Sequence, residues 1–581
     1  MKQQQFIFKS ESELESELKK ILGWYQSGNF SALLIRIYTE LLDQSMIEKT
    51  SAKIGEILPE ALIVGCSSYG NIVNGDFSGG SVAVICTAFE CPSTKIEILQ
   101  YPLCADSQIE VTEKLCEEVI RRPWVKGVEL LVTIRGMSVT ALCEGLSELP
   151  DGVQVFGGGA FCQNLEHNDA CVFSSAGSYQ EKGIVFILFG GEDLRIESTF
   201  LTGWKPVGQY LDVTAADGPI LKELNGKPAY DTYYKYLHIK NDENFFFNTL
   251  EFPFLYRYNG LDIMRAPTAS NPDGSLTMTA DISKGVSARI AYGDPWTILS
   301  FAWQQGNELL QFAPECISVF SCAARRTFWG DTDVGKETEP YQAVAPTSGF
   351  YTSGEFLRTN GLVNQHNVTQ VIAAMREGPA KPHPAREIAM ASHKFEGKIS
   401  MINRMATFIK ATTEELMEAN RRLKELSVTD AMTGVKNKTA YYARMEKLDA
   451  EIQDGFTEFA MAVFDLNGLK EINDSLGHEA GDRYIKKACK IICSKFKHSP
   501  VYRMGGDEFV AILEGEDFER REELLSAFEK QMDANLKQGK VSIASGYSSF
   551  DPAQDKSYHT VMKRADNNMY QRKRQMKEIN R

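Results

Sequence analysis

The chain has 581 residues, with 43% hydrophobic and 24% charged side chains and a net charge of −14. Its length predicts several domains, and its acidic balance argues against general nucleic-acid binding. No apolar stretch is long enough to span a membrane, and the polar residues 1–20 are unlike a secretory signal. The twelve cysteines form no Cys-x-x-Cys pair, as expected for thiols in a reducing compartment. We therefore expect a cytoplasmic protein without a nucleic-acid or membrane partner.

The N-terminal half alternates short strands with helices. Apolar runs at 61–70, 81–89 and 128–136 predict buried strands, and glycines separate them at the turns. The glycine run at 156–161 could contact phosphate, but it is not a Gly-x-Gly-x-x-Gly motif that opens a helix. Tight turns are the favoured interpretation, and this half is predicted to be α/β.

Three stretches of this half carry a family resemblance: VGCSSYGNIVNG (64–75), ISVFSCAARR (317–326) and GFYTSGEFLRTNGLVNQHNVTQ (349–370). They resemble the FIST sensory module. The resemblance divides the region into a FIST N-terminal part at 1–222 and a FIST C-terminal part at 223–376. It implies a domain that binds a small molecule, such as an amino acid.

Four residues of the FIST motifs are candidates to line a ligand pocket: Cys322, Arg325, Tyr351 and Glu355. The alternative is that these side chains hold the fold together, and the sequence favours neither interpretation. For Cys322 in particular, a buried structural thiol is the favoured interpretation over a reactive one.

A linker and signalling segment follows at 377–427. Three prolines in EGPAKPHPAREIAM (377–390) predict a break after the FIST region. Apolar residues then recur at alternating spacings of three and four, which predicts a coiled-coil seam over 402–426 and a parallel homodimer. The seam residues are Ile402, Met405, Ile409, Thr412, Leu416, Ala419, Leu423 and Leu426. The alternative is an amphipathic helix that packs against one of the chain's own domains.

The C-terminal region delivers carboxylates to the ends of two predicted strands. An apolar run beginning at Phe459 ends in Asp465 and Asn467, and Gly-Gly at 505–506 joins two apolar runs just before Asp507 and Glu508. Buried carboxylates are costly unless they are paired or bind a metal. Two strand-borne acids suit the oxygen-ligand chemistry of Mg²⁺ with a nucleotide phosphate.

Four motifs in this region carry a second resemblance: DAMTGVKNKTAYY (430–442), FDLNGLKEINDSLGHEAGD (464–482), RMGGDEF (503–509) and ADNNMY (565–570). Residues 428–581 resemble the GGDEF family of diguanylate cyclases. This implies a central antiparallel sheet flanked by helices, like the nucleotidyl cyclases and polymerase palms. The chain is thus predicted to be a mixed α/β and α+β multidomain protein. The family's reaction joins two GTP into cyclic di-GMP and releases two pyrophosphates.

The resemblance implies a metal site of four residues. Asp465 and Asp507 would be the Mg²⁺ carboxylates, with Mn²⁺ as the alternative ion, and the backbone carbonyl of Leu466 would be a further ligand. Glu508 would support the metal site. Asp507 would also accept the proton of the attacking 3′-hydroxyl.

The resemblance also implies contacts to GTP. Lys470 would stabilise charge on the reacting phosphate, and Asn473 and Asp482 would read guanine. An aspartate can accept from guanine N1–H and N2–H₂, which adenine does not offer. His478 lies between these two in the sequence and would border the base or ribose.

The basic tail 571–581 would add phosphate contacts from Lys573 and Lys577, although the usual fate of a charge run is a solvated helix face. The family commonly has Gly-Arg where this chain has Met576-Lys577, so the contact at Lys577 lacks a guanidinium fork.

Many family members bind their product through an arginine nine residues before the first glycine of the motif and an aspartate three residues after that arginine. Here these positions are Phe496 and Ser499. Neither side chain can replace a guanidinium or a carboxylate, so no tight product site is expected.

The favoured interpretation is a homodimeric diguanylate cyclase controlled by a FIST domain that senses a small molecule. The alternative is a catalytically silent GTP-binding receptor or scaffold that signals through protein partners.

Overall fold

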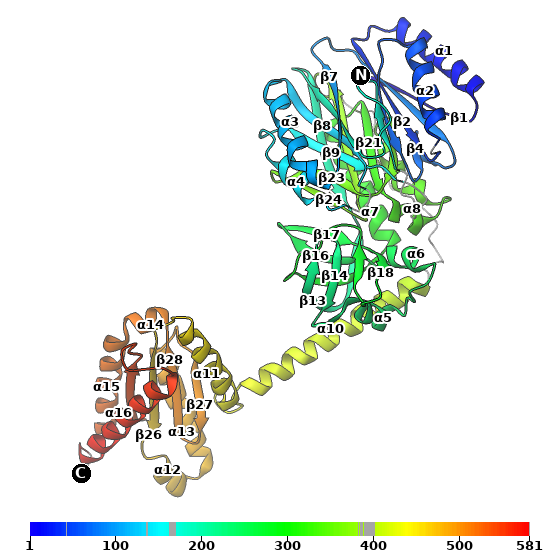
Figure 1. Ribbon diagram of the computed structural model, residues 1–581. Coiled ribbons are helices and arrows are strands. Elements are labelled where there is room, and N and C mark those ends of the chain that lie inside the picture. Colours follow the sequence, from blue (N-terminus) through cyan, green and yellow to red (C-terminus); the bar gives the residue numbers. More distant parts are fainter. Residues whose placement is uncertain are drawn as a thin grey trace. The chain divides into compact units, whose positions relative to one another are not determined.

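The computed structural model describes residues 1–41, 43–134, 137–161, 170–381, 383, 387–388 and 401–579. It contains two compact units, Met1–Thr413 and Glu414–Arg581, which are described in turn (Figure 1). Six of the fourteen residues of the predicted break at 377–390 lie outside the described residues.

The N-terminal unit contains three repeats of one strand-and-helix order. The first repeat consists of β1 (Lys2–Phe8), α1 (Glu11–Ser27), β2 (Ala32–Thr39), α2 (Gln44–Ile57), β3 (Leu62–Ser67), β4 (Asn71–Val73), β5 (Asp76–Ser78) and β6 (Val82–Phe89). Strands β2 and β3 are parallel, and β6 runs antiparallel to both β2 and β1. The helices begin at Ser10 and Asp43, whose side chains accept from backbone N–H groups of the first turn.

The second and third repeats have the same order. The second consists of β7 (Lys95–Pro102), α3 (Gln108–Ile120), β8 (Val125–Val132), α4 (Thr140–Ser147), β9 (Gln154–Gly159), β10 (Val172–Ser174) and β11 (Gly183–Gly190). The third consists of β12 (Leu194–Leu201), α7 (Pro295–Phe312), β21 (Cys316–Cys322), α8 (Ala323–Trp329), α9 (Glu339–Gln342), β22 (Thr347–Thr352), β23 (Glu355–Thr359), β24 (Leu362–His366) and β25 (Gln370–Glu377). The parallel pair recurs as β8 with β9 and as β21 with β22. The antiparallel neighbour recurs as β11 beside β8 and as β25 beside β21.

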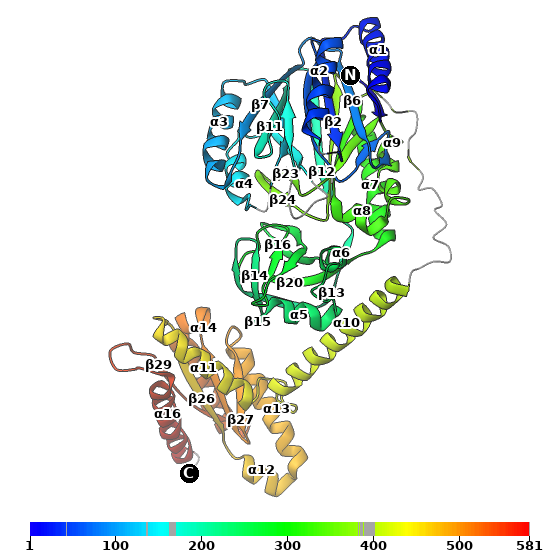
Figure 2. The ribbon, with the colours of Figure 1, turned by 45° about the vertical axis from the view of Figure 1, so that its right-hand side comes forward.

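The repeats exchange the strands that follow their parallel pairs. Strands β4 and β5 of the first repeat join the sheet of the third, β10 of the second joins the first, and β23 and β24 of the third join the second. The inner faces of the three sheets share one apolar core, which includes Leu34, Leu131 and Phe320. Helices cover the outer faces, as α1 and α2 do in Figure 1 and α3 and α4 do in Figure 2. The exchange makes the three repeats one folding unit.

A further sheet is inserted between β12 and α7. Its strands are β13 (Trp204–Asp217), β14 (Ile220–Leu224), β15 (Lys227–Pro228), β16 (Phe254–Tyr258), β17 (Leu261–Arg265), β18 (Pro267–Ser270), β19 (Leu276–Met278) and β20 (Ser287–Gly293), with helices α5 (Ala229–Leu237) and α6 (Phe245–Leu250). The domain boundary predicted at 222/223 falls within β14. The inserted sheet has its own apolar core, around Leu221, Tyr233 and Phe254.

The predicted seam lies in one continuous helix, α10 (Met401–Val428). Leu416 and Leu423 are exposed, and Met405 and Ile409 line an apolar pocket with Tyr236 and Phe252 of the inserted region. The exposure of Leu416 and Leu423 agrees with a seam that faces a partner chain. The position of Met405 and Ile409 agrees with a helix that packs against the chain's own domain. The side chains of Ile402 and Leu426 lie outside the described set, and the dimer stays a prediction.

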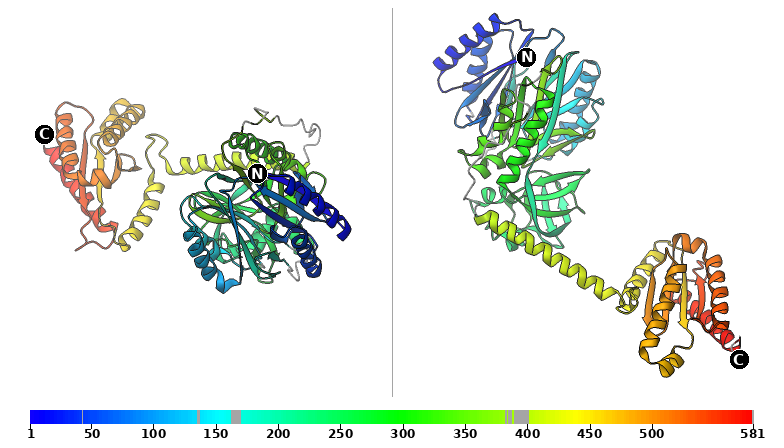
Figure 3. Two further views of the ribbon diagram at one scale, coloured as in Figure 1. Left: turned by 90° about the horizontal axis from the view of Figure 1, so that it is seen from above. Right: turned by 180° about the vertical axis from the view of Figure 1, so that it is seen from behind.

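The C-terminal unit is built on a four-stranded sheet in the order β27-β28-β26-β29, and all of its pairs are antiparallel, as the GGDEF resemblance implies. The strands are β26 (Ala460–Leu466), β27 (Val501–Gly505), β28 (Glu508–Leu513) and β29 (Ile543–Ser549). The helices are α11 (Lys438–Gln453), α12 (Leu469–Leu476), α13 (His478–Lys495), α14 (Gly515–Glu519), α15 (Arg521–Lys537) and α16 (Tyr558–Ile579). Helix α16 packs against β26 and β29 (Figure 3).

One face of α13 packs into the core of this unit, where Ile485, Ala488, Cys489 and Ile492 are all buried. Within the described part of the chain, no helix is both long and apolar enough to cross a membrane.

Candidate active site and sensory region

The acidic residues of the C-terminal unit meet at one edge of its sheet. In the β26–β28 ladder Asp465 lies opposite Glu508, and the Leu466 amide donates to the Asp507 carbonyl at 3.1 Å. The turn before Asp507 uses Gly505 at φ 148° and Gly506 at φ 51°, where glycine is favoured. The two strand ends therefore bring the three predicted carboxylate residues together.

An arginine that the sequence prediction did not assign holds this turn. Arg503 donates to the Gly506 carbonyl from Nη2 at 2.8 Å, and its Nη1 lies 3.2 Å from Asp430 Oδ1. Asp430 also accepts from the Thr433 hydroxyl. The sequence did contain an indication of this contact, because Asp430 is the first residue of the motif at 430–442 and Arg503 is the first residue of the motif at 503–509.

The carboxylates lie in an environment that disfavours their negative charge. Loss of solvation raises the pKa of Asp465, and the ion pair with Lys573 offsets part of this. Loss of solvation also raises the pKa of Glu508, and the charges of Asp465, Asp507 and Asp566 raise it further. Such a cluster is stabilised by a cation, because a cation favours the ionised carboxylates.

Helix α16 supplies one such cation. The Lys573 ammonium pairs with Asp465, and Lys577, one turn later, lies close enough to favour ionisation of the same carboxylate. Met576 between them is buried and accepts a weak hydrogen bond from Asn467 Nδ2, 3.5 Å from its sulfur. The buried methionine thus fixes the helix orientation that directs Lys573 toward the acids.

The predicted base-reading residues lie on the two helices that meet at Gly477, Asn473 in α12 and Asp482 in α13. A Cβ on Gly481 would lie 1.9 Å from Asn473 Oδ1, so only glycine allows this approach beside Asp482. Gly477, at φ 81°, forms the turn between the helices. His478 and Lys470 are exposed, and no contact joins them to the carboxylates among the described residues.

Tyr484 is a second residue that the sequence prediction missed. Its hydroxyl donates to the Asn467 carbonyl at 2.9 Å and accepts from the Ser542 amide at 3.2 Å. It therefore fixes the segment after β26 to the start of β29, where the acidic cluster lies.

No group of three or more His, Cys, Asp or Glu side chains is arranged to hold a metal ion in the ranges that the structure describes. Mg²⁺ is usually held by one or two carboxylates together with substrate phosphates and water. Asp465 and Asp507 satisfy that smaller requirement, and the ion pair of Asp465 with Lys573 places positive charge where an ion would be favourable. The residues present therefore fit a divalent ion that arrives with a nucleotide.

The four FIST pocket candidates are buried inside the N-terminal unit, with exposed fractions of 6% or less. Arg325 forms a two-pronged ion pair with Glu337 at 2.8 and 3.1 Å. Glu355 accepts from the hydroxyls of Thr352 and Thr369. Burial raises the pKa of Cys322 far above its usual range, so the thiol stays protonated. None of the four lines the pocket of about 650 Å³ beside the inserted sheet, and a ligand contact by them stays a prediction.

Several relatives and solved structures are similar to the C-terminal part. The diguanylate cyclase DgcP of Pseudomonas aeruginosa is 27% identical over 189 residues, which cover 32% of this chain and 27% of that protein. The probable diguanylate cyclase DgcJ of Escherichia coli is 30% identical over 146 residues, which cover 25% of this chain and 29% of that protein. The chain thus spans less than a third of either relative.

Among solved structures, the coiled coil and GGDEF domain of DgcB from Caulobacter crescentus, in complex with c-di-GMP, is 25% identical to this chain. The match covers 30% of this chain and 95% of that one, with a TM-score of 0.27.

Family models match three successive regions. Residues 37–227 match the FIST N domain, 229–358 match the FIST C domain, and 427–579 match the diguanylate cyclase GGDEF domain. The chain therefore carries matches to the FIST N, FIST C and GGDEF domain families, in that order.

Proposed function

We propose that the protein is a diguanylate cyclase that makes cyclic di-GMP from two GTP and is controlled by a small molecule at its FIST region. The observation that carries the proposal is the convergence of Asp465, Asp507 and Glu508 at one sheet edge, with Lys573 paired to Asp465. This arrangement suits the binding of a cation with a polyphosphate.

In this proposal Asp465, Asp507 and the Leu466 carbonyl would hold a divalent ion, Mg²⁺ or alternatively Mn²⁺, and Glu508 would support the site. When bound, the ion neutralises phosphate charge and makes the 3′-hydroxyl easier to deprotonate. Lys573, which pairs with Asp465 in this structure, would be available to a phosphate oxygen if Asp465 held the ion.

The reaction is phosphoryl transfer by positioning and charge stabilisation. The 3′-oxygen of one GTP forms a bond to the α-phosphorus of the other, and the bond from that phosphorus to pyrophosphate breaks. Asp507 accepts the proton of the 3′-hydroxyl. Lys470, Lys573 and Lys577 stabilise charge on the phosphates. A second, symmetric transfer closes the ring.

Guanine recognition is proposed for Asn473 in α12 and Asp482 in α13, and the close approach of Asn473 Oδ1 to Gly481, the residue before Asp482, supports it. The Asp482 carboxylate accepts from N1–H and N2–H₂ of guanine, and His478 borders the base or the ribose. An adenine nucleotide offers no matching pair of donors, so the site is expected to select GTP over ATP.

Each C-terminal unit would hold one GTP, so two chains must meet. We place their contact along 402–426 of α10, where Leu416 and Leu423 are exposed. A ligand in the FIST region, such as an amino acid, would change how often the two GTP sites face each other.

The test is to incubate the full-length protein with GTP and Mg²⁺ and to identify the product by mass spectrometry. Cyclic di-GMP is expected with GTP and not with ATP. GTP binding measured by calorimetry, together with no cyclic di-GMP under any metal condition, would instead indicate the silent receptor.

A further inference from the structure

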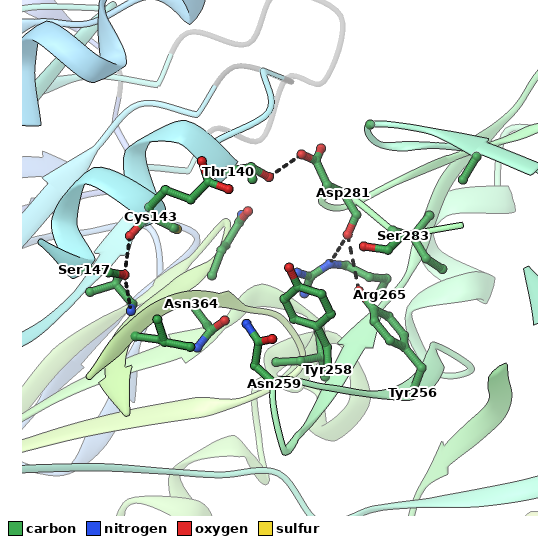
Figure 4. Close-up of a pocket in the computed structure, with 18 of the residues that line it drawn as sticks. Thr140, Cys143, Ser147, Tyr256, Tyr258, Asn259, Arg265, Asp281, Ser283 and Asn364 are labelled. Carbon is green, nitrogen blue, oxygen red and sulfur yellow. Dashed lines mark hydrogen bonds between the residues drawn. The ribbon is translucent and has the colours of Figure 1, made fainter. Parts of the chain in front are cut away.

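A pocket of about 650 Å³ lies between the second repeat and the inserted sheet. One wall is formed by α4 and the edge strand β24, and the other by β17 and the turns near Asp281 (Figure 4). Both walls belong to the N-terminal unit. None of the residues predicted from the FIST motifs lines the pocket, although Asn364 and Gln365 come from the last of those motifs.

The pocket floor presents buried polar atoms that lack a partner. Asn364 and Gln365 are 9% and 7% exposed, and their side-chain nitrogens have no hydrogen-bond partner among the described residues. The same holds for Asp281 Oδ1. Since an unsatisfied buried polar group is destabilising and uncommon, three of them in one pocket indicate a polar ligand.

The carboxylate of Asp281 is only partly satisfied by the protein. Its Oδ2 accepts from the hydroxyls of Ser138 and Thr140. Arg265 does not pair with this carboxylate, since its Nε donates to the Asp281 backbone carbonyl at 2.9 Å and its Nη1 to Asn367 Oδ1 at 3.2 Å. Asp281 Oδ1 is therefore positioned to accept from a ligand.

The charge of the lining favours a cation. Four acidic side chains, Glu144, Glu148, Asp217 and Asp281, face two basic ones, Arg265 and Lys284. The amide nitrogen of Gln365, on the same face of β24 as Phe356, complements this with a donor for an oxygen acceptor.

We propose that this pocket binds a small molecule that carries an ammonium group and an oxygen acceptor. The ammonium donates to Asp281 Oδ1, and the acceptor receives from the Gln365 amide, which lies on the face of β24 that α4 covers. This pocket and this class of ligand would account for the sensing of a small molecule in the proposed function. Binding itself does not depend on the proposed function, whereas an effect of binding on cyclic di-GMP formation does. Because Asp281 also bridges to Ser138 and Thr140, an occupied pocket would join the second repeat to the inserted sheet more tightly.

The experiment is calorimetry on the full-length protein without GTP, so that its result is independent of cyclase activity. The probes are L-arginine and L-lysine, their decarboxylated counterparts agmatine and cadaverine, and succinate, which lacks an amine. We expect the two amino acids to bind, the diamines to bind more weakly, and succinate not to bind. Asp281→Asn should weaken binding about tenfold or more, because hydrogen bonds to charged groups contribute more than neutral ones.

The matched control is Asp262→Asn, the same change at an exposed position of β17 outside the pocket lining, which should leave affinity unchanged. Gln365→Leu removes a floor donor and serves as a second variant if Asp281→Asn does not fold. No binding of any amine probe would overturn the proposal. So would affinity that neither pocket variant changes, or succinate binding as tightly as the amino acids.

Discussion

Two acidic side chains with raised pKa values, Glu355 in the N-terminal unit and Asp465 in the C-terminal unit, have opposite surroundings. Glu355 is fully buried, which raises its pKa to about 8, and both of its oxygens accept from threonine hydroxyls. Asp465 lies at a strand end beside other carboxylates and pairs with a lysine. Hydroxyl partners stabilise a buried, protonated carboxyl group. A lysine partner at a strand end stabilises an ionised carboxylate, which can exchange one cation for another. A raised pKa alone therefore does not mark a functional site.

The same contrast extends to the motifs of the two units. The FIST motif residues Cys322, Arg325, Tyr351 and Glu355 are interior, whereas Lys470, His478 and Glu508 of the GGDEF motifs are exposed. Changes in the first group should act mainly on the folding free energy, and changes in the second mainly on turnover. The predictions below test that division.

The largest effect is expected for Asp507→Asn. The variant keeps the side-chain shape but removes the charge and the proton acceptor, so cyclic di-GMP formation should fall about 10²–10⁴-fold. Its melting temperature should match that of the wild type. Asp454→Asn, an exposed aspartate at the end of α11, is the control and should stay active. Near-normal turnover by Asp507→Asn would contradict its assignment.

The next effect concerns the exposed apolar residues of α10. The double variant Leu416→Lys with Leu423→Lys would place charges in a dimer core, and should give a monomer that binds GTP without making cyclic di-GMP. The double control Ala411→Lys with Met417→Lys adds the same charge off the seam. Light scattering and turnover at low protein concentration are the measurements. A monomeric seam variant with full activity would show that the seam is not needed.

A smaller effect is expected at the sealed carboxyl. Because the folded-state pKa of Glu355 is raised from 4.5 to about 8, the stability that its protonated form contributes is full below pH 4.5 and is lost as pH rises to 8. Glu355→Gln has no such loss. Between pH 5 and 8, the unfolding free energy of the variant should therefore rise relative to that of the wild type by about 1.4 kcal/mol per pH unit. Melting temperatures of the two proteins, measured across this pH range, report the change.

The control for this series is Glu243→Gln, at an exposed position, which should run parallel to the wild type. A constant difference between Glu355→Gln and the wild type across the pH range would mean that Glu355 is ionised in the folded protein. Unchanged cyclase activity in Glu355→Gln would agree with a structural role.

The acidic edge was predictable because strand ends are local features. The apolar run before Asp465 and the glycines before Asp507 indicate two strands that deliver acids, and Cys489 lies on a helical stripe that marks it as core. The ion pair of Lys573 with Asp465 could not be derived in this way, since it depends on how α16 packs across the sheet.

The N-terminal unit was less predictable because its order is long-range. Residues 71–78 form the hairpin of β4 and β5, and nothing in their local sequence indicates that this hairpin joins the sheet of the third repeat. For the same reason Asp281 carries no signal in the sequence: its partners Ser138 and Thr140 lie about 140 residues away. The pocket exists only when the repeats and the inserted sheet are assembled.

The smallest effect is expected for product feedback, because the position where related proteins carry the product-binding arginine is a buried phenylalanine here. Phe496 is 1% exposed and packs between Phe464 and Phe528, with ring centroids 5.4 and 5.9 Å away. It offers no donor to cyclic di-GMP, and Ser499 carries no charge. Lys497 nearby is exposed, but its ammonium is a point charge without the bidentate fork of arginine.

Cyclic di-GMP added at low-micromolar concentration should therefore leave the initial rate within about twofold of that without it, because a point-charge contact at an exposed site contributes little. The measurement is a progress curve of pyrophosphate release with product present from the start. Lys495→Ala with Lys497→Ala is the matched variant and should behave as the wild type does. Strong noncompetitive inhibition that persists in this variant would reveal a product site elsewhere on the chain, and it would show that burial of Phe496 does not prevent feedback.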